Sequence, residues 1–81
     1  MNPRVLTVEY KGDYQLLLTF TNKEVKQFDL STYLNYPIYE PLKDEAFCKK
    51  VKADDGIIVW DEYIDFDPDM LYMESKPVSP L

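Results

Sequence analysis

Carboxylates are the chemistry-bearing side chains that stand closest together in this sequence. Asp65, Asp67 and Asp69 are spaced like the first ligands of a calcium-binding loop. The rest of such a loop does not follow, because Met70 stands where the turn needs glycine and Lys76 where a bidentate glutamate is needed. A regulatory domain that binds a divalent metal or a small ligand through these carboxylates is therefore the second of two hypotheses, not the first.

The residue types that are absent exclude several kinds of chemistry. The chain has no histidine and a single cysteine, Cys48. Serine–histidine and cysteine–histidine nucleophiles are thus excluded, and so is every zinc site that needs imidazole. A lone cysteine forms no disulfide within the chain, which favours a reducing compartment, and Cys48 itself is expected in the core. We expect a protein that is not an enzyme and holds no cofactor or metal.

Negative charge is concentrated in the last third of the chain. Residues 53–75 hold eight acidic residues and no basic one, whereas residues 1–52 are close to neutral, and the net charge is −6. Such a surface repels phosphate, which disfavours direct nucleic-acid binding, and a basic partner is its natural complement. The alternative is an acidic face that only keeps the protein in solution.

Within this acidic region, four neighbouring residues are the candidates for partner binding: Asp61, Glu62, Tyr63 and Asp65. Tyr63 lies where a turn is expected, so its ring is expected to be exposed, and large aromatic residues dominate interface energetics. Trp60 ends an apolar run and is expected in the core. The leading hypothesis is a protein-interaction module that binds a small basic partner protein.

Alternation of apolar and polar residues predicts three strands of an antiparallel meander, at residues 5–10, 14–20 and 24–30. In the first strand, Leu6, Val8 and Tyr10 are expected to share one face. The second turn contains Asn22, a residue that tolerates positive φ.

The second half of the chain predicts a hairpin. Asp54-Asp55-Gly56 separates two apolar runs, which is a strong hairpin signal. Residues 57–60 are apolar throughout, so this strand is expected to be covered on both faces. Residues 64–67 alternate apolar and acidic side chains and predict a short half-buried strand.

Two short helices are predicted by their N-terminal residues. Asp44 is expected to cap a helix over residues 45–50, and Asp67 a second one that has Pro68 at its first position. Between the strands and the first helix, Ser31 is expected to cap a helical turn over residues 32–35. The prolines that follow predict an extended segment over residues 36–42.

These patterns predict one α+β domain over residues 1–73, with a β-meander, a β-hairpin and one or two short helices, and a flexible C-terminal tail over residues 74–81. We expect no signal peptide, and no apolar run in the given sequence reaches the length that spans a bilayer. We expect a cytoplasmic protein that does not associate with membranes.

One set of residues resembles a known family, the bacterial domain of unknown function 2442. The set covers about residues 5–73 and comprises Asp29-Leu30, Pro41-Leu42-x-Asp44, Phe47, Gly56, Trp60 and Asp65-Phe66-Asp67-Pro68-Asp69-x-Leu71-Tyr72. Two departures are visible: Asn22-Lys23 stands where the family has Asp-Gly, and Tyr63 where it has glycine.

The resemblance implies a small α+β fold with an antiparallel sheet. It also implies, for some members, a neighbouring gene for another small protein, an arrangement that suggests a toxin–antitoxin-like pair. The family has no established catalytic residues, so the resemblance assigns none here.

Overall fold

Two antiparallel sheets and a set of short helices build the molecule. The structure is a computed structural model, and it describes residues 2–61 and 64–78. The first sheet has the order β1-β2-β3-β7 and the second the order β4-β5-β6. The elements in chain order are β1 (Val5–Gly12), β2 (Gln15–Phe20), β3 (Val25–Asp29), the 3₁₀ helices η1 (Leu30–Tyr33) and η2 (Pro37–Lys43), α1 (Glu45–Cys48), β4 (Lys52–Asp54), β5 (Ile57–Val59), β6 (Asp65–Phe66), α2 (Pro68–Glu74) and β7 (Lys76–Pro77). The predicted α+β class, with a meander and a hairpin, is confirmed.

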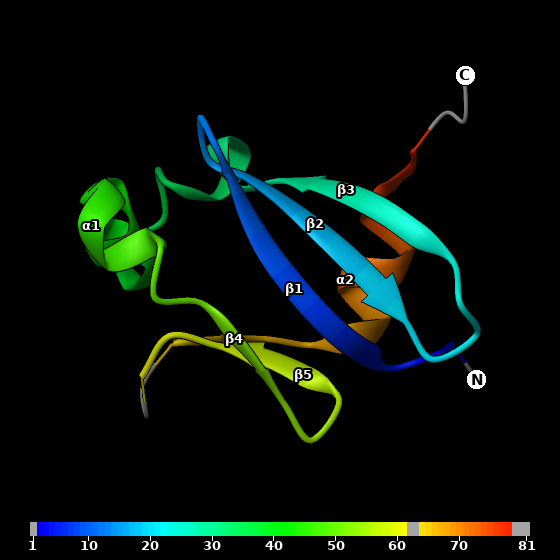
Figure 1. Cartoon of the computed structure of the whole chain (residues 1–81). Coiled ribbons are helices and arrows are strands. Elements are labelled where there is room, and N and C mark those ends of the chain that lie inside the picture. The colour runs from blue at the N-terminus through cyan, green and yellow to red at the C-terminus, as the bar shows by residue number, and fades with distance from the viewer. Residues whose placement is uncertain (1, 62–63, 79–81) are drawn as a thin grey trace.

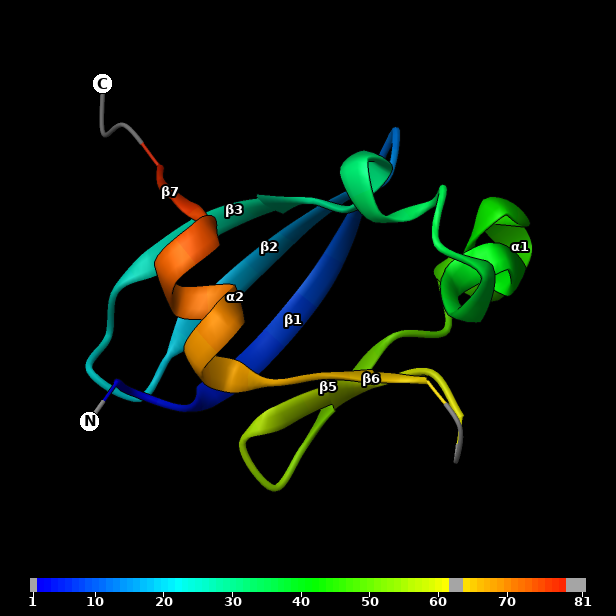
Figure 2. The ribbon, with the colours of Figure 1, turned by 180° about the vertical axis from the view of Figure 1, so that it is seen from behind.

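The three main layers are arranged around one core. Helix α2 lies behind the first sheet in Figure 1 and in front of it in Figure 2, and the β4–β5 hairpin lies below that sheet in both views. Buried side chains from each layer form one hydrophobic cluster, for example Leu18 from β2, Ile58 from β5 and Leu71 from α2. Burial of this apolar surface is the main force that holds the layers together.

A bulge changes the inward face of β1. The pairing of β1 with β2 shifts between Val5 and Thr7, so that Leu6 has no regular partner in the ladder. Val5 is buried and Leu6 is 58% exposed, whereas Val8 and Tyr10 pack against the core. The predicted face was therefore correct for Val8 and Tyr10 and wrong for Leu6, because an extra residue moves the side chains before it to the opposite face.

In the β2–β3 turn, the residue with positive φ comes one position later than expected. Lys23, not Asn22, takes the left-handed conformation, with φ of 75°. Asn22 instead accepts a hydrogen bond on Oδ1 from the Glu24 amide at 3.0 Å. A lysine thus occupies a backbone position for which glycine has no steric penalty.

The side chains of β5 alternate between half-exposed and buried, although this strand is apolar throughout. Ile58 pairs with Ala53 on one side and Phe66 on the other, and it is fully buried. Ile57 and Val59 remain half-exposed on the other face. The prediction that this strand is covered on both faces is wrong, because only one face of the sheet packs against the core.

Residues 30–43 also differ from the prediction. Asp29, rather than Ser31, caps η1 through a hydrogen bond from the Ser31 amide to Oδ1. The segment expected to be extended is the 3₁₀ helix η2, which has Pro37 at its start, where a missing N–H costs nothing, and Pro41 inside it. Tyr39 therefore lies within the helix, and Tyr36 is its N-cap residue.

Both predicted α-helix starts are confirmed. Asp44 accepts a hydrogen bond from the Ala46 amide, and Asp67 accepts one from the Met70 amide with Pro68 in the first helical position. Helix α1 ends at Cys48, somewhat earlier than expected.

The chain after the predicted domain boundary at residue 73 makes contacts with the first sheet. Helix α2 continues to Glu74, Ser75 is buried, and β7 pairs with Lys26 and Gln27 of β3. Val78 then donates from its amide to the Val25 carbonyl at 3.2 Å. The edge of β3 supplies backbone partners that the composition of the tail does not reveal.

The side chains of Cys48 and Trp60 both lie in the core, as predicted. Cys48 is fully buried, and burial raises the pKa of its thiol to about 11. Trp60 is also buried, and its indole Nε1 donates to the Cys48 carbonyl at 2.9 Å.

Among the described residues, no helix has the length and apolar character that would let it cross a bilayer.

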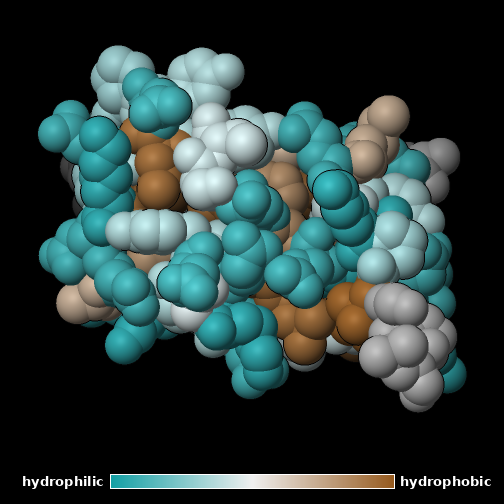
Figure 3. Space-filling model, turned by 90° about the horizontal axis from the view of Figure 1, so that it is seen from above, coloured by the Kyte–Doolittle hydropathy of each residue, from teal (hydrophilic) through white to brown (hydrophobic). Residues whose placement is uncertain are grey.

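Exposed apolar side chains are scattered. Seen from above, the molecule shows mostly hydrophilic side chains, and the apolar ones appear in small separate patches (Figure 3). The large exposed apolar residues come from different elements: Leu6, Val25, Tyr36, Ile38, Met73 and Val78. A docking surface must therefore be identified from charge and local geometry as well as from hydrophobicity.

Candidate functional site

The second sheet carries a hollow of about 350 Å³ on its outer face, which we call the acidic hollow. Three of its lining residues are aspartates and one is a lysine: it is lined by Lys52, Asp54, Val59, Trp60, Asp61 and Asp65. Two of the four predicted partner-binding residues, Asp61 and Asp65, thus lie in one site. Glu62 and Tyr63 lie outside the described residues.

Strand register explains how the hollow is assembled. Val59, in the central strand, is paired with Lys52 of β4 and with Asp65 of β6. Asp54 is two residues after Lys52, so its side chain points to the same face. The result is a half-buried valine with exposed charged side chains on both sides.

Asp61 has a structural role as well as a charge. Its Oδ1 accepts a hydrogen bond from the Ile64 amide at 3.0 Å, and the Trp60 amide donates to the Ile64 carbonyl at 3.0 Å. These two bonds close the connection between β5 and β6. Replacing Asp61 would therefore change both the charge and the local backbone.

The carboxylates of the C-terminal region are spread out rather than convergent. Asp65 belongs to the acidic hollow, whereas Asp67 Oδ2 accepts from the Met70 amide at 3.2 Å and begins α2. Within residues 2–61 and 64–78, no three His, Cys, Asp or Glu side chains lie together as metal ligands. The arrangement can attract a cationic group and bury a small apolar one.

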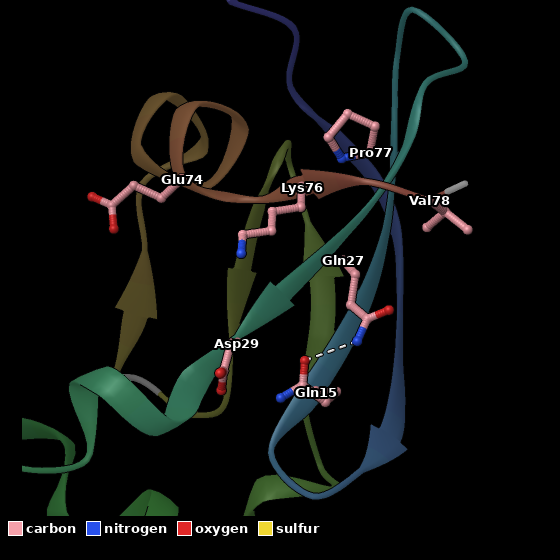
Figure 4. A pocket seen from close by; sticks show the side chains of 7 residues that line it. All are labelled: Gln15, Gln27, Asp29, Glu74, Lys76, Pro77 and Val78. Atoms are coloured by element: carbon pink, nitrogen blue, oxygen red, sulfur yellow. Dashed lines mark hydrogen bonds between the residues drawn. The ribbon is translucent and has the colours of Figure 1, made fainter.

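A polar groove of about 410 Å³ lies where β7 joins the first sheet (Figure 4), and we call it the end groove. Its lining residues come from β2, β3, α2 and the C-terminal segment: Gln15, Gln27, Asp29, Glu74, Lys76, Pro77 and Val78. Gln27 Nε2 donates to Gln15 Oε1 at 2.9 Å. The pKa of Asp29 is lowered, first by hydrogen bonds from Ser31 and also by the charge of Lys76.

Sequence reasoning missed the end groove because residues 74–81 were expected to form a flexible tail. It also missed Lys52 and Asp54, although these could have been found from the hairpin signal. A hairpin through Asp55-Gly56 fixes the register, and strand alternation then places both side chains on the outer face.

Three tyrosines form a further cluster, the tyrosine triangle, made of Tyr33, Tyr36 and Tyr39. The ring centroids lie 6.0 Å (Tyr33 to Tyr36), 6.2 Å (Tyr33 to Tyr39) and 6.5 Å (Tyr36 to Tyr39) apart. The expected extended segment concealed this cluster. The signal in the sequence is the spacing of three between Tyr36 and Tyr39. The Tyr39 amide donates to the Tyr36 carbonyl at 2.9 Å, and this turn brings the two residues together.

Comparison with known proteins gives one result. No curated protein and no solved structure matches this chain. Residues 5–77 match the family described as protein of unknown function (DUF2442), in agreement with the resemblance seen in the sequence. With nearly its whole length covered by that match, the chain belongs to the DUF2442 family.

Proposed function

We propose that this protein is a non-enzymatic interaction module that binds a small basic protein through the acidic hollow. The observation that carries the proposal is the exposed outer face of the second sheet, where Asp54, Asp61 and Asp65 surround the half-buried Val59. One lysine, Lys52, opposes three carboxylates there.

This arrangement suits a protein partner in two ways. An apolar centre with a charged rim is the usual organisation of a protein–protein interface. The unbalanced negative charge accelerates encounter with a basic protein and disfavours acidic competitors. The lack of histidine in the chain supports a binding role over a catalytic one.

Antitoxin-like neutralisation is the most concrete form of the proposal. An acidic protein that covers the basic functional surface of a small partner blocks that surface by charge complementarity. Co-expression with the product of the neighbouring gene tests this form directly. Relief of a growth defect by the wild-type chain is the expected outcome.

Charge reversal tests the general proposal. The tagged 81-residue chain is used to capture proteins from its host, as wild type, as Asp54→Lys/Asp65→Lys, and as Glu9→Lys/Asp13→Lys. The control pair changes the net charge by the same amount at exposed sites on the first hairpin. We expect basic proteins to be captured by the wild type and the control variant and lost from the Asp54/Asp65 variant.

Equal capture by all three proteins, or capture of no basic protein by the wild type, would show the proposal to be wrong. Circular dichroism on each variant establishes that the fold is retained. Asp61 is left unchanged because its carboxylate closes the β5–β6 connection.

The end groove favours a second candidate function, recognition of a small polar ligand. It presents both signs of charge, from Asp29, Glu74 and Lys76, together with the amides of Gln15 and Gln27. NMR titration with free amino acids as probes is expected to shift the signals of these two side-chain amides.

Calorimetric titration with Mg²⁺, Mn²⁺ and Ca²⁺ tests the alternative that the protein binds a divalent metal. If none of the three ions produces heat, that alternative is wrong.

A further inference from the structure

One row of side chains crosses the outer face of the second sheet from edge to edge. Lys52 of β4 pairs with Val59 of β5, and Val59 pairs with Asp65 of β6. Because directly paired residues of neighbouring strands point to the same face, these three side chains lie side by side, and all three line the acidic hollow. The sheet thus presents a cation, an apolar centre and an anion in a line, which we call the cross-strand row.

The two charged ends of the cross-strand row are available to a partner. Lys52 and Asp65 are exposed, and Val59 between them is half-buried. Within residues 2–61 and 64–78, the recorded ion pair joins Lys11 to Glu9, and neither end of the row takes part in one. Each end can therefore pair with an opposite charge from another molecule.

The spacing of the row decides which kind of segment fits it. Neighbouring strands lie about 4.8 Å apart, so the two ends of a row across three strands are separated by about 10 Å. On an α-helix, residues i, i+4 and i+7 share one face, and i and i+7 are about 10.5 Å apart along the axis. In a strand, residues i, i+2 and i+4 share one face and span about 13 Å. A helix therefore matches the row, whereas a strand is too long by about 3 Å.

Asp54 adds negative charge beside the cationic end of the row. It follows Lys52 by two residues on β4, lies on the same face and lines the same hollow. A helix over the cross-strand row passes this carboxylate on its flank, where a basic side chain can pair with it. The partner can thus carry one acidic residue over Lys52 and still be basic overall.

We propose that the partner docks an amphipathic α-helix across β4, β5 and β6, with an acidic residue over Lys52, an apolar residue over Val59 and a basic residue over Asp65. This inference rests on the proposed function. It adds the secondary structure and the charge pattern of the partner's docking segment, and a helix that lays one face on its receptor is a recurring mode of recognition.

Two alanine-based helical peptides of identical composition serve as probes, each with one glutamate, one leucine and three lysines. In the matched peptide, glutamate, leucine and lysine occupy positions i, i+4 and i+7, and the other lysines lie on the opposite face. In the exchanged peptide, the glutamate and a lysine of the opposite face trade places, so the docking face carries lysine, leucine and lysine.

NMR titration of the 81-residue chain at low salt measures both affinities. The matched peptide should bind about threefold more tightly than the exchanged one, because a charge pair at an exposed site replaces a repulsion. The methyl signals of Val59 should shift. The matched peptide with proline in its centre should bind more weakly, because proline breaks the helix.

Variants at one end of the row test the assignment of the charges. Lys52→Glu should reverse the preference, so that the exchanged peptide binds more tightly, whereas Lys11→Glu should keep it. The control makes the same charge change at an exposed strand position of the first sheet. Circular dichroism establishes that both variants are folded.

Four results would overturn the inference: equal or tighter binding of the exchanged peptide by the wild type, no binding of either peptide, undiminished binding of the proline peptide, or an unchanged preference in Lys52→Glu. If the preference for the matched peptide is absent while capture of basic proteins still depends on Asp54 and Asp65, the inference fails and the proposed function stands.

Discussion

Two tyrosine sites in this molecule differ in one component. At Tyr72, the ring has Lys26 above it at 3.8 Å, and the hydroxyl donates to Glu24 Oε1 at 2.5 Å. At the tyrosine triangle, the Tyr33 hydroxyl donates to the Glu74 carboxylate, and among the described residues no cation is recorded over the three rings. The first site combines ring, carboxylate and cation within the chain, and the second has two of the three.

The difference separates stabilisation of the fold from recognition. Lys26 and Glu24 come from β3 and from the turn before it, and together with Tyr72 they join the first sheet to α2. A site completed from within can only stabilise the fold. A site that lacks its cation can bind one from a partner.

The largest expected contrast is in stability. Tyr72→Ala removes the edge contact with Phe20 at 5.1 Å and both polar contacts of the ring, so it should lower the free energy of unfolding by about 2–3 kcal/mol. Tyr36→Ala should change it by less than about 0.5 kcal/mol, because the ring is mostly exposed. Urea denaturation measures both, and similar losses in the two variants would contradict the comparison.

Alkaline pH should weaken the fold through three groups: Tyr72, Tyr33 and Cys48. The hydrogen bond to Glu24 is the main cause that raises the pKa of Tyr72, and burial raises the pKa of Tyr33 to about 12 and of Cys48 to about 11. Above the ordinary pKa of each group, the unfolded chain releases its proton while the folded chain keeps it.

The stability from these groups is therefore complete below about pH 9 and is lost as the pH rises towards 12. Urea midpoints across this range provide the measurement. In Glu24→Gln, ultraviolet titration should show Tyr72 ionising at lower pH; an unchanged titration would mean that Glu24 is not the cause.

A smaller effect is expected from the cation itself. Lys26→Met keeps an apolar stem but loses the charge over Tyr72 and the hydrogen bond to the Tyr72 carbonyl at 2.9 Å. The free energy of unfolding should fall by about 1 kcal/mol. Urea denaturation measures the change, and unchanged stability in Lys26→Met would contradict the comparison.

The smallest expected effect concerns the turn that positions Glu24. Lys23→Gly relieves a left-handed lysine with φ of 75° and should raise the free energy of unfolding by up to about 1 kcal/mol. The Tyr72–Glu24 bond should persist, as seen from an unchanged Tyr72 titration. Destabilisation by this substitution would indicate that the lysine side chain has a role that the turn geometry does not show.

Local signals in the sequence predicted most of the fold. The Asp-Gly turn, the alternation over β2 and the caps at Asp44 and Asp67 each depend on neighbouring residues, and each was confirmed. Two of the failures depend on distant partners. The bulge at Leu6 and the pairing of β7 with β3 are set by tertiary packing, which composition and periodicity do not report.

The candidate site was predictable to the same degree. Asp61 and Asp65 were identified from the acidic run, and their place on one surface followed from short-range strand geometry. Tyr36 and Tyr39 were not identified, because two prolines in one segment favoured an extended chain. The 3₁₀ helix η2 accommodates Pro37 at its start and Pro41 inside it, and the hydrogen bond from the Tyr39 amide to the Tyr36 carbonyl brings the two tyrosines together.

The most direct test of the central claim compares the capture of basic host proteins by the wild type, by Asp54→Lys/Asp65→Lys and by Glu9→Lys/Asp13→Lys. If the acidic hollow binds the partner, capture should be lost from the Asp54/Asp65 variant and kept by the other two proteins. Equal capture by all three proteins would contradict the account of a docking surface at the hollow.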